Sequence, residues 1–481
     1  MHDRLFSREV GSLSPRDFAK TVTTDLLRSF GLAQHHRFDG ASGRLFGDEN
    51  DRGGDIHDTS ILAHNGGANS LAIEKFDGRF MVSGGSDGSI RIWDLEAFPN
   101  PHRPALYRPV SAISRQRPAL FMEGHISGVT HVDFHPSKKD FFLSSSFDKS
   151  LKLWSCSTST VTTHYDIKSK VFAHASSPIS SSPVVACATQ DSNVRLVDLR
   201  TNSAARSLLA SGGAVFSVAW SPRHERVLAS GHSDGKVRVW DIRRALNPLG
   251  MLDMEDSLGI LHRFNHAMSS GLGWSYMPKV REAATAHADA VNGLTWTDDG
   301  NYIVTAGLDR RIRVWNAATG SNTLAGFGST VRNSVIGPLH MVVPPSNLTA
   351  GCRELLFWPN EQEILVFDLH EGYVVSRMRV PGASTMFEAS PKNRITCMAW
   401  RGSGGRRRML GPEVGGATAP GGIYTSHADG HIRAWLPRID NPDELKEEDG
   451  FIGDDEETKK RKRKVLDDAY RSLMGKQITF T

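Results

Sequence analysis

Residues 233–244 read Ser-Asp-Gly-Lys-Val-Arg-Val-Trp-Asp-Ile-Arg-Arg, which predicts a tight turn followed by a β-strand. Asp234 and Gly235 supply the turn, because glycine tolerates the positive φ that tight hairpins require. From Val237 the side chains alternate between two faces, as in a strand. Four other segments have the same turn aspartate six residues before a tryptophan: Asp87 and Trp93, Asp148 and Trp154, Asp309 and Trp315, and Asp429 and Trp435. The recurrence predicts a repeat protein.

The composition is that of a globular chain and indicates no particular partner. The 481 residues are 39% hydrophobic, and the net charge of +4 is small for this length. Four cysteines without C-x-x-C spacing fit a reducing, intracellular environment. No apolar run approaches 18 residues and the N-terminus lacks a signal-peptide core, so we expect no membrane span and no secretion.

Seven repeats can be counted when two weaker copies are included. In the third and sixth copies, Val197 and Phe367 stand where the others have tryptophan. Trp154, Val197 and Trp240 are spaced 43 residues apart, as expected for a four-stranded propeller blade. Longer intervals elsewhere predict inserts at 103–117, 246–280 and 402–421.

This is the WD40 repeat pattern, and it predicts an all-β, seven-bladed β-propeller with an N-terminal helical segment and a charged C-terminal tail. The predicted boundaries are 1–55, 56–437 and 438–481. In this fold a loop histidine, a strand Ser or Thr, the turn aspartate and the tryptophan form a hydrogen-bonded set, so we expect a structural rather than a catalytic role for its members. The set comprises His64, Asp87, Trp93, His125, Asp148, Trp154, Asp234, His287, Asp309, Trp315, Asp429 and Trp435.

An amphipathic helix is predicted before the first repeat. Ser14 is a candidate N-cap and Pro15 suits the first helical position, while Gly31 is a candidate C-cap. Its apolar stripe consists of Phe18, Val22, Leu26 and Phe30, with Leu27 beside them. Such a stripe either packs on the protein's own core or inserts into a partner's groove, and the sequence leaves both open.

The tail changes from acidic to basic. Residues 444–457 are rich in Asp and Glu, and a basic run follows, consisting of Lys459, Lys460, Arg461, Lys462, Arg463 and Lys464. The run is a candidate nuclear localisation signal or a non-specific nucleic-acid contact, and a solvated tail is the plain alternative. Residues 465–474 have the pattern of a short helix.

Nothing in the sequence carries an enzyme's signature. There is no H-E-x-x-H, no phosphate-binding loop, no nucleophile elbow and no histidine cluster with metal spacing. We therefore predict a non-enzymatic binding protein with no catalytic residue, no cofactor and no metal. No base-reading motif is present, so direct sequence-specific DNA binding is not expected.

The blade phrases resemble the Cockayne syndrome A protein family, WD-repeat substrate receptors of transcription-coupled nucleotide excision repair. The phrases that carry the resemblance lie at 78–88, 144–154, 218–223, 240–244, 286–294 and 313–316. The resemblance implies a nuclear substrate receptor of a cullin-RING ubiquitin ligase. It also implies three partners: the large adaptor subunit of the damage-specific DNA-binding protein, stalled RNA polymerase II, and the repair-coupling ATPase of that polymerase.

The resemblance further implies that the adaptor is bound through the N-terminal helix and Trp-Asp-x-Arg motifs. Residues 240–243 match that motif in full, residues 197–200 match it except at tryptophan, and residues 93–96 lack its arginine. The implied adaptor-binding residues are Phe18, Val22, Leu26, Leu27, Phe30, Arg200, Trp240, Asp241 and Arg243. The alternative function is a WD40 scaffold of another nuclear complex, in chromatin or ribosome assembly.

Overall fold

The computed structural model describes residues 2–40, 61–98, 104–115, 124–178, 184–200, 203–244, 247–259, 284–350, 353–380, 393–402 and 421–437. By its contacts the chain divides into two compact units, Met1–Pro437 and Arg438–Thr481. The basic run and the short helix predicted at 465–474 lie outside the described residues.

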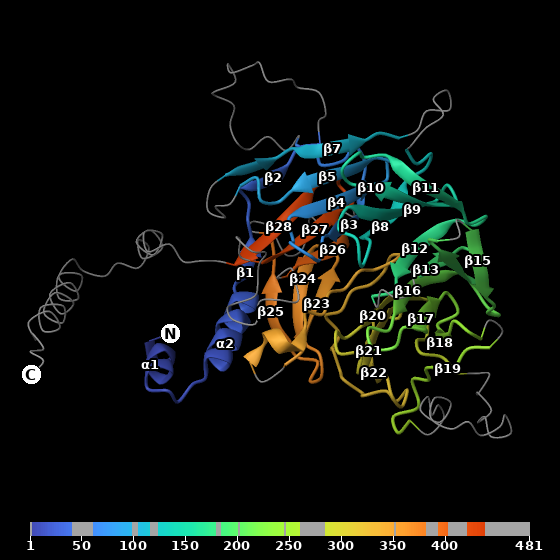
Figure 1. The fold of residues 1–481 in the computed structure, drawn as a ribbon. Helices are drawn as coiled ribbons and strands as arrows, with labels where there is room; N and C mark the ends of the chain where they lie inside the picture. Colours follow the sequence, from blue (N-terminus) through green and yellow to red (C-terminus); the bar gives the residue numbers. More distant parts are fainter. Residues whose placement is uncertain are drawn as a thin grey trace, which may run out of the picture. The chain divides into compact units, whose positions relative to one another are not determined.

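The first unit is a seven-bladed β-propeller, as the repeats predict (Figure 1). In the first four blades the strands follow the chain from the inner to the outer edge. Blade 1 contains β3 (Ala68–Ile73), β4 (Phe80–Gly85), β5 (Ile90–Asp94) and β7 (Pro109–Ile113), and blade 2 contains β8 (Val129–Phe134), β9 (Phe141–Ser146), β10 (Ser150–Ser155) and β11 (Val161–Asp166). Blade 3 contains β12 (Val171–Ser176), β13 (Val184–Thr189), β14 (Val194–Asp198) and β15 (Ser203–Leu208), and blade 4 contains β16 (Val215–Trp220), β17 (Val227–His232), β18 (Val237–Asp241) and β19 (Gly250–Met251).

The last three blades are less regular. Blade 5 contains β20 (Val291–Trp296), β21 (Tyr302–Gly307) and β22 (Ile312–Asn316), and blade 6 contains β23 (Leu355–Asn360), β24 (Glu363–Asp368) and β25 (Val374–Met378). In blade 6 the innermost position is taken by the segment around Val342, which forms a single bridge to Phe357. Blade 7 contains β26 (Ile395–Arg401), β27 (Gly422–His427) and β28 (Ile432–Pro437), and its outermost strand is β1 (Phe30–Leu32) from the N-terminal segment.

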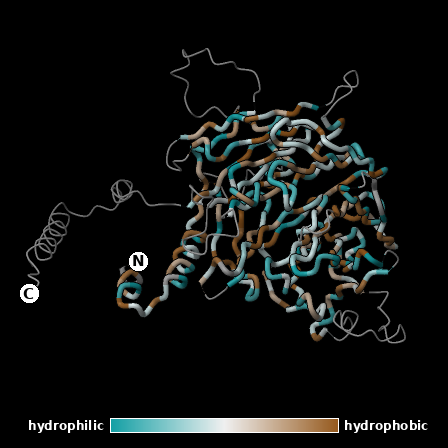
Figure 2. The backbone as a smooth tube through the Cα atoms, in the orientation of Figure 1, coloured by the Kyte–Doolittle hydropathy of each residue, from teal (hydrophilic) through white to brown (hydrophobic). Residues whose placement is uncertain are grey.

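Hydrophobic side chains gather in the seams between neighbouring blades. The described residues form seven such clusters, one for each seam of the ring. Each repeat tryptophan lies in the seam with the preceding blade, and Val197 and Phe367 occupy the same place in blades 3 and 6. Figure 2 shows the hydrophobic stretches running along the strands of the blades. The seams explain why valine and phenylalanine can replace tryptophan: the position requires apolar volume in every blade.

The N-terminal segment closes the ring, which the sequence does not predict. Strand β1 pairs antiparallel with β28, and β2 (His36–Phe38) pairs in parallel with β6 (Ala105–Tyr107) beside blade 1. Phe38 stacks on Tyr107 with ring centroids 4.7 Å apart and lies edge-on to Trp93. Thus, of residues 30–38, predicted to belong to a separate segment, β1 joins the sheet of blade 7 and β2 forms a two-stranded sheet with β6. The predicted insert 103–117 likewise contains β6 and the outer strand β7.

Two helices precede β1. They are α1 (His2–Glu9) and α2 (Pro15–Arg28), and the hydroxyl of Ser14 caps α2 by accepting from the backbone N–H of Asp17. The helix ends before Gly31, because Phe30 already belongs to β1. The hydroxyl of Thr24 accepts from the backbone N–H of Ala350, just after the short 3-10 helix η2 (Ser346–Leu348), and this contact holds α2 against blade 6.

Candidate functional site

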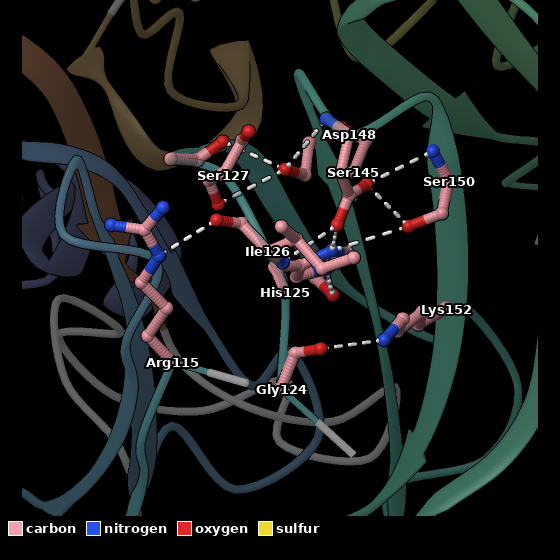
Figure 3. A network of polar contacts seen from close by, with 12 residues as sticks. Arg115, Gly124, His125, Ile126, Ser127, Ser145, Asp148, Ser150 and Lys152 are labelled. Carbon is pink, nitrogen blue, oxygen red and sulfur yellow. Dashed lines mark hydrogen bonds and ion pairs between the residues drawn. The ribbon is translucent and has the colours of Figure 1, made fainter. Parts of the chain in front are cut away.

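Blade 2 contains the hydrogen-bonded set in full, and Figure 3 shows its part around His125, Asp148 and Ser150. His125 Nδ1 lies 2.9 Å from Asp148 Oδ2, and His125 Nε2 lies 2.7 Å from the hydroxyl of Ser144. The same hydroxyl accepts from the Trp154 indole N–H at 2.7 Å. A neutral imidazole with its proton on Nδ1 satisfies every partner: it donates to the carboxylate, accepts from the serine hydroxyl, and leaves the serine oxygen free to accept from the indole.

Blade 5 repeats this geometry, and blade 1 varies it. In blade 5, His287 lies 2.9 Å from Asp309 and 2.8 Å from the hydroxyl of Thr305, which accepts from Trp315. In blade 1, His64 contacts Ser83 and Ser89 at 2.8 Å, and Ser89 donates to Asp87, which itself lies 3.6 Å from the imidazole. The Ser83 hydroxyl again accepts from Trp93. In all three blades the histidine comes from the loop before the first strand, so we call them loop-histidine blades.

Blades 4 and 7 build the same contact with a histidine from another position. His232 and His427 end the second strands of their blades, where blades 1 and 5 have glycine. Their Nε2 atoms lie 2.8 Å from the hydroxyls of Ser230 and Thr425, which accept from Trp240 and Trp435. We call these strand-histidine blades. Neither histidine was predicted to have this role, although a histidine directly before the Ser-Asp-Gly or Ala-Asp-Gly turn is a visible signal in the sequence.

The turn aspartates of the strand-histidine blades bind an arginine without a loop histidine. Asp234 and Asp429 accept from the guanidinium groups of Arg238 and Arg433, at 3.0 and 2.9 Å. The arginine stands four residues after the aspartate in each case, on the third strand. The aspartate is therefore paired in both blade types, with the loop histidine in blades 2 and 5 and with an arginine in blades 4, 5 and 7, since Arg313 also donates to Asp309 at 2.9 Å.

Burial and hydrogen bonding fix the charges of these groups. Burial lowers the pKa values of His125 and His287 below the ordinary value, although their aspartates raise them in part. Burial alone would raise the pKa of Asp148, but the hydrogen bonds from His125 and Ser150 outweigh it and hold this pKa well below its usual range. Neutral imidazole beside ionised carboxylate is the state expected near pH 7. Both ring nitrogens of His125 and His287 have hydrogen-bond partners within their own blade.

The helix residues predicted to bind an adaptor lie partly inside the propeller. Leu27 is fully buried and Phe30 is 4% exposed, and both pack in the seam between blades 6 and 7. Leu26 packs against the same cluster, while Phe18 and Val22 are half-buried. The apolar stripe thus covers the chain's own core at its C-terminal end, which removes Leu27 and Phe30 from any partner's reach.

The exit arginines predicted to face an adaptor are paired within their own motifs. Arg243 donates from Nε and Nη2 to the carboxylate of Asp241, with the shortest separation 2.5 Å. Arg200 lies 3.6 Å from Asp198 in blade 3, and Arg79 pairs with Asp94 in blade 1 although it precedes the aspartate in sequence. Trp240, the first residue of the full motif, is fully buried in the seam between blades 3 and 4.

Three histidines from three blades meet in the central channel. His131 of β8 lies edge-on to His174 of β12, with centroids 4.5 Å apart, and stacks on His340 at 4.7 Å. His174 Nδ1 also contacts the hydroxyl of Ser145 at 2.9 Å. The Nε2 atoms of His174 and His340 are buried without a hydrogen-bond partner in the described structure. Burial lowers the pKa of His174 to about 3 and that of His340 to about 4, so this cluster is neutral. No sequence pattern predicts it, because its members are far apart in the chain.

Within the described ranges, no group of three or more His, Cys, Asp or Glu side chains could hold a metal ion. No helix in the same part of the chain combines the length and the apolar character needed to cross a membrane.

The comparisons with known proteins agree with the fold. The family model described as WD domain, G-beta repeat matches residues 58–94, 116–155, 204–241 and 280–316. These segments fall in blades 1, 2, 4 and 5 and include most of the outer strand of blade 3, and none falls in blade 6 or blade 7. The chain is a WD40 β-propeller, a fold that is generally non-catalytic.

Similar curated proteins include one plant protein and several ribosome biogenesis proteins. The WD repeat-containing protein ATCSA-1 of Arabidopsis thaliana is 29% identical over 380 residues, which cover 68% of this chain and 78% of the relative. The ribosome biogenesis protein ytm1 of Neurospora crassa is 27% identical over 301 residues, 57% of this chain and 59% of the relative. The ribosome biogenesis protein WDR12 homolog of Drosophila sechellia is 24% identical over 257 residues, 53% and 52%. The chain spans about half the length of these ribosome biogenesis relatives.

These relatives contradict the resemblance to Cockayne syndrome A and the function it implied. Their names state ribosome biogenesis or a WD repeat, and none states DNA repair or a ubiquitin ligase. The expected partners were therefore wrong: the large adaptor subunit of the damage-specific DNA-binding protein, the cullin-RING ligase, RNA polymerase II and its repair-coupling ATPase. The physical reason is that the blade phrases encode blade geometry. Asp148 binds His125, and Trp154 donates to the Ser144 hydroxyl that the same histidine contacts, so these residues serve the blade itself.

Proposed function

We propose that this chain is a non-catalytic WD40 scaffold that works in ribosome assembly. One observation carries the proposal: the similar curated proteins in Neurospora, Chaetomium, Phaeosphaeria and Drosophila are named ribosome biogenesis proteins. The same observation favours ribosome assembly over a chromatin complex. The propeller geometry suits a scaffold, because the His–Asp pairs bind within the blades and make them rigid. The wide faces of rigid blades can then bind partners.

Sedimentation with ribosomal precursors tests this proposal. A tagged full-length chain, separated with cell extract on a sucrose gradient, should travel with pre-ribosomal particles that contain precursor rRNA. Depletion of the chain should make precursor rRNA accumulate. A chain that stays at the top of the gradient, and whose depletion leaves precursor rRNA unchanged, would overturn the proposal.

We further propose that the scaffold acts in the nucleus, with the basic run Lys459–Lys464 as the import signal. Six consecutive cations form a sequence that import receptors bind electrostatically. Replacing all six with Gln in a fluorescent fusion should move the protein out of the nucleus. A matched fusion with Lys149, Lys168 and Lys170 replaced by Gln should stay nuclear, and an unchanged location of the first fusion would contradict the proposal.

A further inference from the structure

One mouth of the central channel contains a cavity of about 280 Å³. Inner-strand residues line one part of it, namely Asn69, Thr130, Asn292 and Thr396. Each of these residues is the second residue of its strand. None of the four has a paired residue on the neighbouring strand, as in a β-bulge. The remaining wall comes from the loop 332–339, from Phe147, and from Glu361 and Arg394.

The polar groups of the inner wall are already satisfied within the chain. Asn292 and Asn333 exchange two amide hydrogen bonds, of 2.9 and 2.8 Å. Asn69 donates to the carbonyl of Val129, Thr396 to that of Ala68, and Thr130 shares a hydrogen bond with Ser145. This wall therefore does not require a polar ligand. The features of the cavity that can still attract a ligand are its apolar side chains and its charges.

The rim of the cavity exposes apolar side chains. Ile336 is 70% exposed, Phe147 is 41% exposed, and Val335 is 38% exposed. Ile126, 55% exposed, is next to this rim because its backbone N–H donates to Asp148, the neighbour of Phe147 in sequence. We call these four residues the apolar rim. Exposed apolar residues that surround a cavity are typical of a protein-binding site.

The same mouth has an excess of positive charge. Among the described residues that line the cavity, Glu361 is the one carboxylate, and it faces two guanidinium groups. Arg332 lies 3.8 Å from Glu361, and the same carboxylate also accepts from the hydroxyl of Ser334. Arg394 is half-buried, and its burial lowers its pKa while Glu361 raises it in part. One arginine thus lacks a full counter-charge beside an apolar surface.

We propose that this mouth binds an acidic peptide segment of a partner protein, with an apolar side chain seated against Ile336 and Phe147 and a carboxylate paired with Arg394. A carboxylate supplies the missing counter-charge, and a planar guanidinium can bind it through two hydrogen bonds. Three of the four rim residues are aliphatic and cannot stack on bases, so the surface favours a peptide over RNA. The inference goes beyond the role in ribosome assembly and stands without it.

Fluorescence anisotropy with the full-length chain tests the site. The probe is a labelled peptide, Asp-Glu-Glu-Leu-Ile-Glu-Asp-Asp, compared with a peptide that has Ser-Ser in place of Leu-Ile and with one in which Asn and Gln replace the acids. The first should bind, and both changes should weaken binding about tenfold or more. In the protein, Ile336→Ser and Arg394→Gln should each weaken binding about tenfold, and Arg394→Lys should do so less.

Matched controls separate the site from general surface effects. Leu258→Ser changes an equally exposed apolar residue outside this cavity, and Arg200→Gln removes an exposed guanidinium of blade 3, so both should bind as the unaltered chain does. If Arg394→Gln fails to fold, the exposed Arg332→Gln replaces it. The proposal is overturned if the peptide does not bind, if Ile336→Ser has no effect, or if labelled oligouridine binds more tightly than the peptide with the same dependence on Ile336 and Arg394.

Discussion

The loop-histidine blades and the strand-histidine blades reach the same contact by different routes. Both place an imidazole Nε2 2.7–2.8 Å from a buried hydroxyl that accepts from a tryptophan. In blades 2 and 5, however, the imidazole also binds the turn aspartate. It thereby connects the loop before the first strand to the turn between the second and third strands. In blades 4 and 7 an arginine holds the aspartate without a loop histidine, and in blade 5 Arg313 binds Asp309 in addition to His287. The contact to the tryptophan is therefore the shared requirement, and the source of the histidine is free to vary.

In blades 1 and 5 the two arrangements exclude each other for steric reasons, whereas blade 2 has the small Ser146 at the strand end beside its loop histidine. A Cβ at Gly307 would lie 2.6 Å from His287 Nδ1, and one at Gly85 would be even closer to His64 Nδ1. His232 and His427 occupy this same position in their own blades. A blade can thus hold a histidine in the loop or at the strand end, but its centre has room for one imidazole.

The largest effect is expected from removing a loop histidine. His125→Leu keeps the side-chain volume but leaves Asp148 and Ser144 without their shared partner, so we expect a loss of roughly 3 kcal/mol in the free energy of unfolding. Urea unfolding followed by tryptophan fluorescence measures it. His164→Leu on β11 is the control, because His164 is exposed on an outer strand, and it should change stability little. Equal losses in the two variants would show that the set does not stabilise the blade.

A smaller loss is expected from filling the space that the loop histidine needs. Gly307→Ala brings its Cβ within 2.6 Å of His287 Nδ1, so the imidazole must shift away from Asp309, at a cost of about 2 kcal/mol. Gly326→Ala is the matched control, because nothing lies within 4 Å of its Cβ. If both variants unfold at the same urea concentration, the steric exclusion between the two arrangements is wrong.

Much of the fold could be predicted because each blade is specified locally. The turn aspartate, the third strand and the tryptophan stand within a few residues of one another, and even the weak third and sixth copies keep an apolar residue at the seam. Ring closure could not be predicted in this way. The three residues of β1 carry little strand signal, and they pair with β28, about 400 residues away in the chain. The three channel histidines likewise come from separate blades.

The function was mispredicted for a related physical reason. The residues that carried the resemblance, such as Trp93 and Asp148, are those that every blade of this kind uses for its own hydrogen bonds. They report the fold rather than the partner. The apolar stripe of α2 left two interpretations open for a similar reason, because the periodicity of a helix shows that one face is buried but not what buries it. In the structure Leu27 and Phe30 are buried by blades 6 and 7.

The strand histidines should contribute less than the loop histidines, and not equally. His427 Nδ1 donates to the carbonyl of Asn393 at 2.9 Å, whereas His232 Nδ1 has no partner in the described structure. We expect His427→Leu to cost about 1.5 kcal/mol and His232→Leu about 1 kcal/mol, because each keeps its aspartate–arginine pair. The same urea titration compares them. If His232→Leu lowers the free energy of unfolding as much as His125→Leu does, the hydrogen bond from the loop histidine to its aspartate does not add to stability.

The smallest expected effect is the part of the pH dependence that the strand histidine His427 contributes. Burial lowers the pKa of His427 to about 3, below the 6.5 of an unfolded chain. The unfolded chain therefore binds more protons between these values, and the stabilisation is complete above pH 6.5 and is lost as the pH falls toward 3. From pH 8 to pH 6 this histidine should account for a loss of about 0.8 kcal/mol in the free energy of unfolding. Asp429 titrates only below its unfolded value of 3.8 and does not contribute in this window. The difference between the unaltered chain and His427→Leu, measured at both pH values, isolates this single group. If the stability difference between the unaltered chain and His427→Leu is the same at pH 8 and pH 6, His427 is protonated as easily in the blade as in the unfolded chain. The contact with Thr425 and Trp435 would then not require a neutral imidazole.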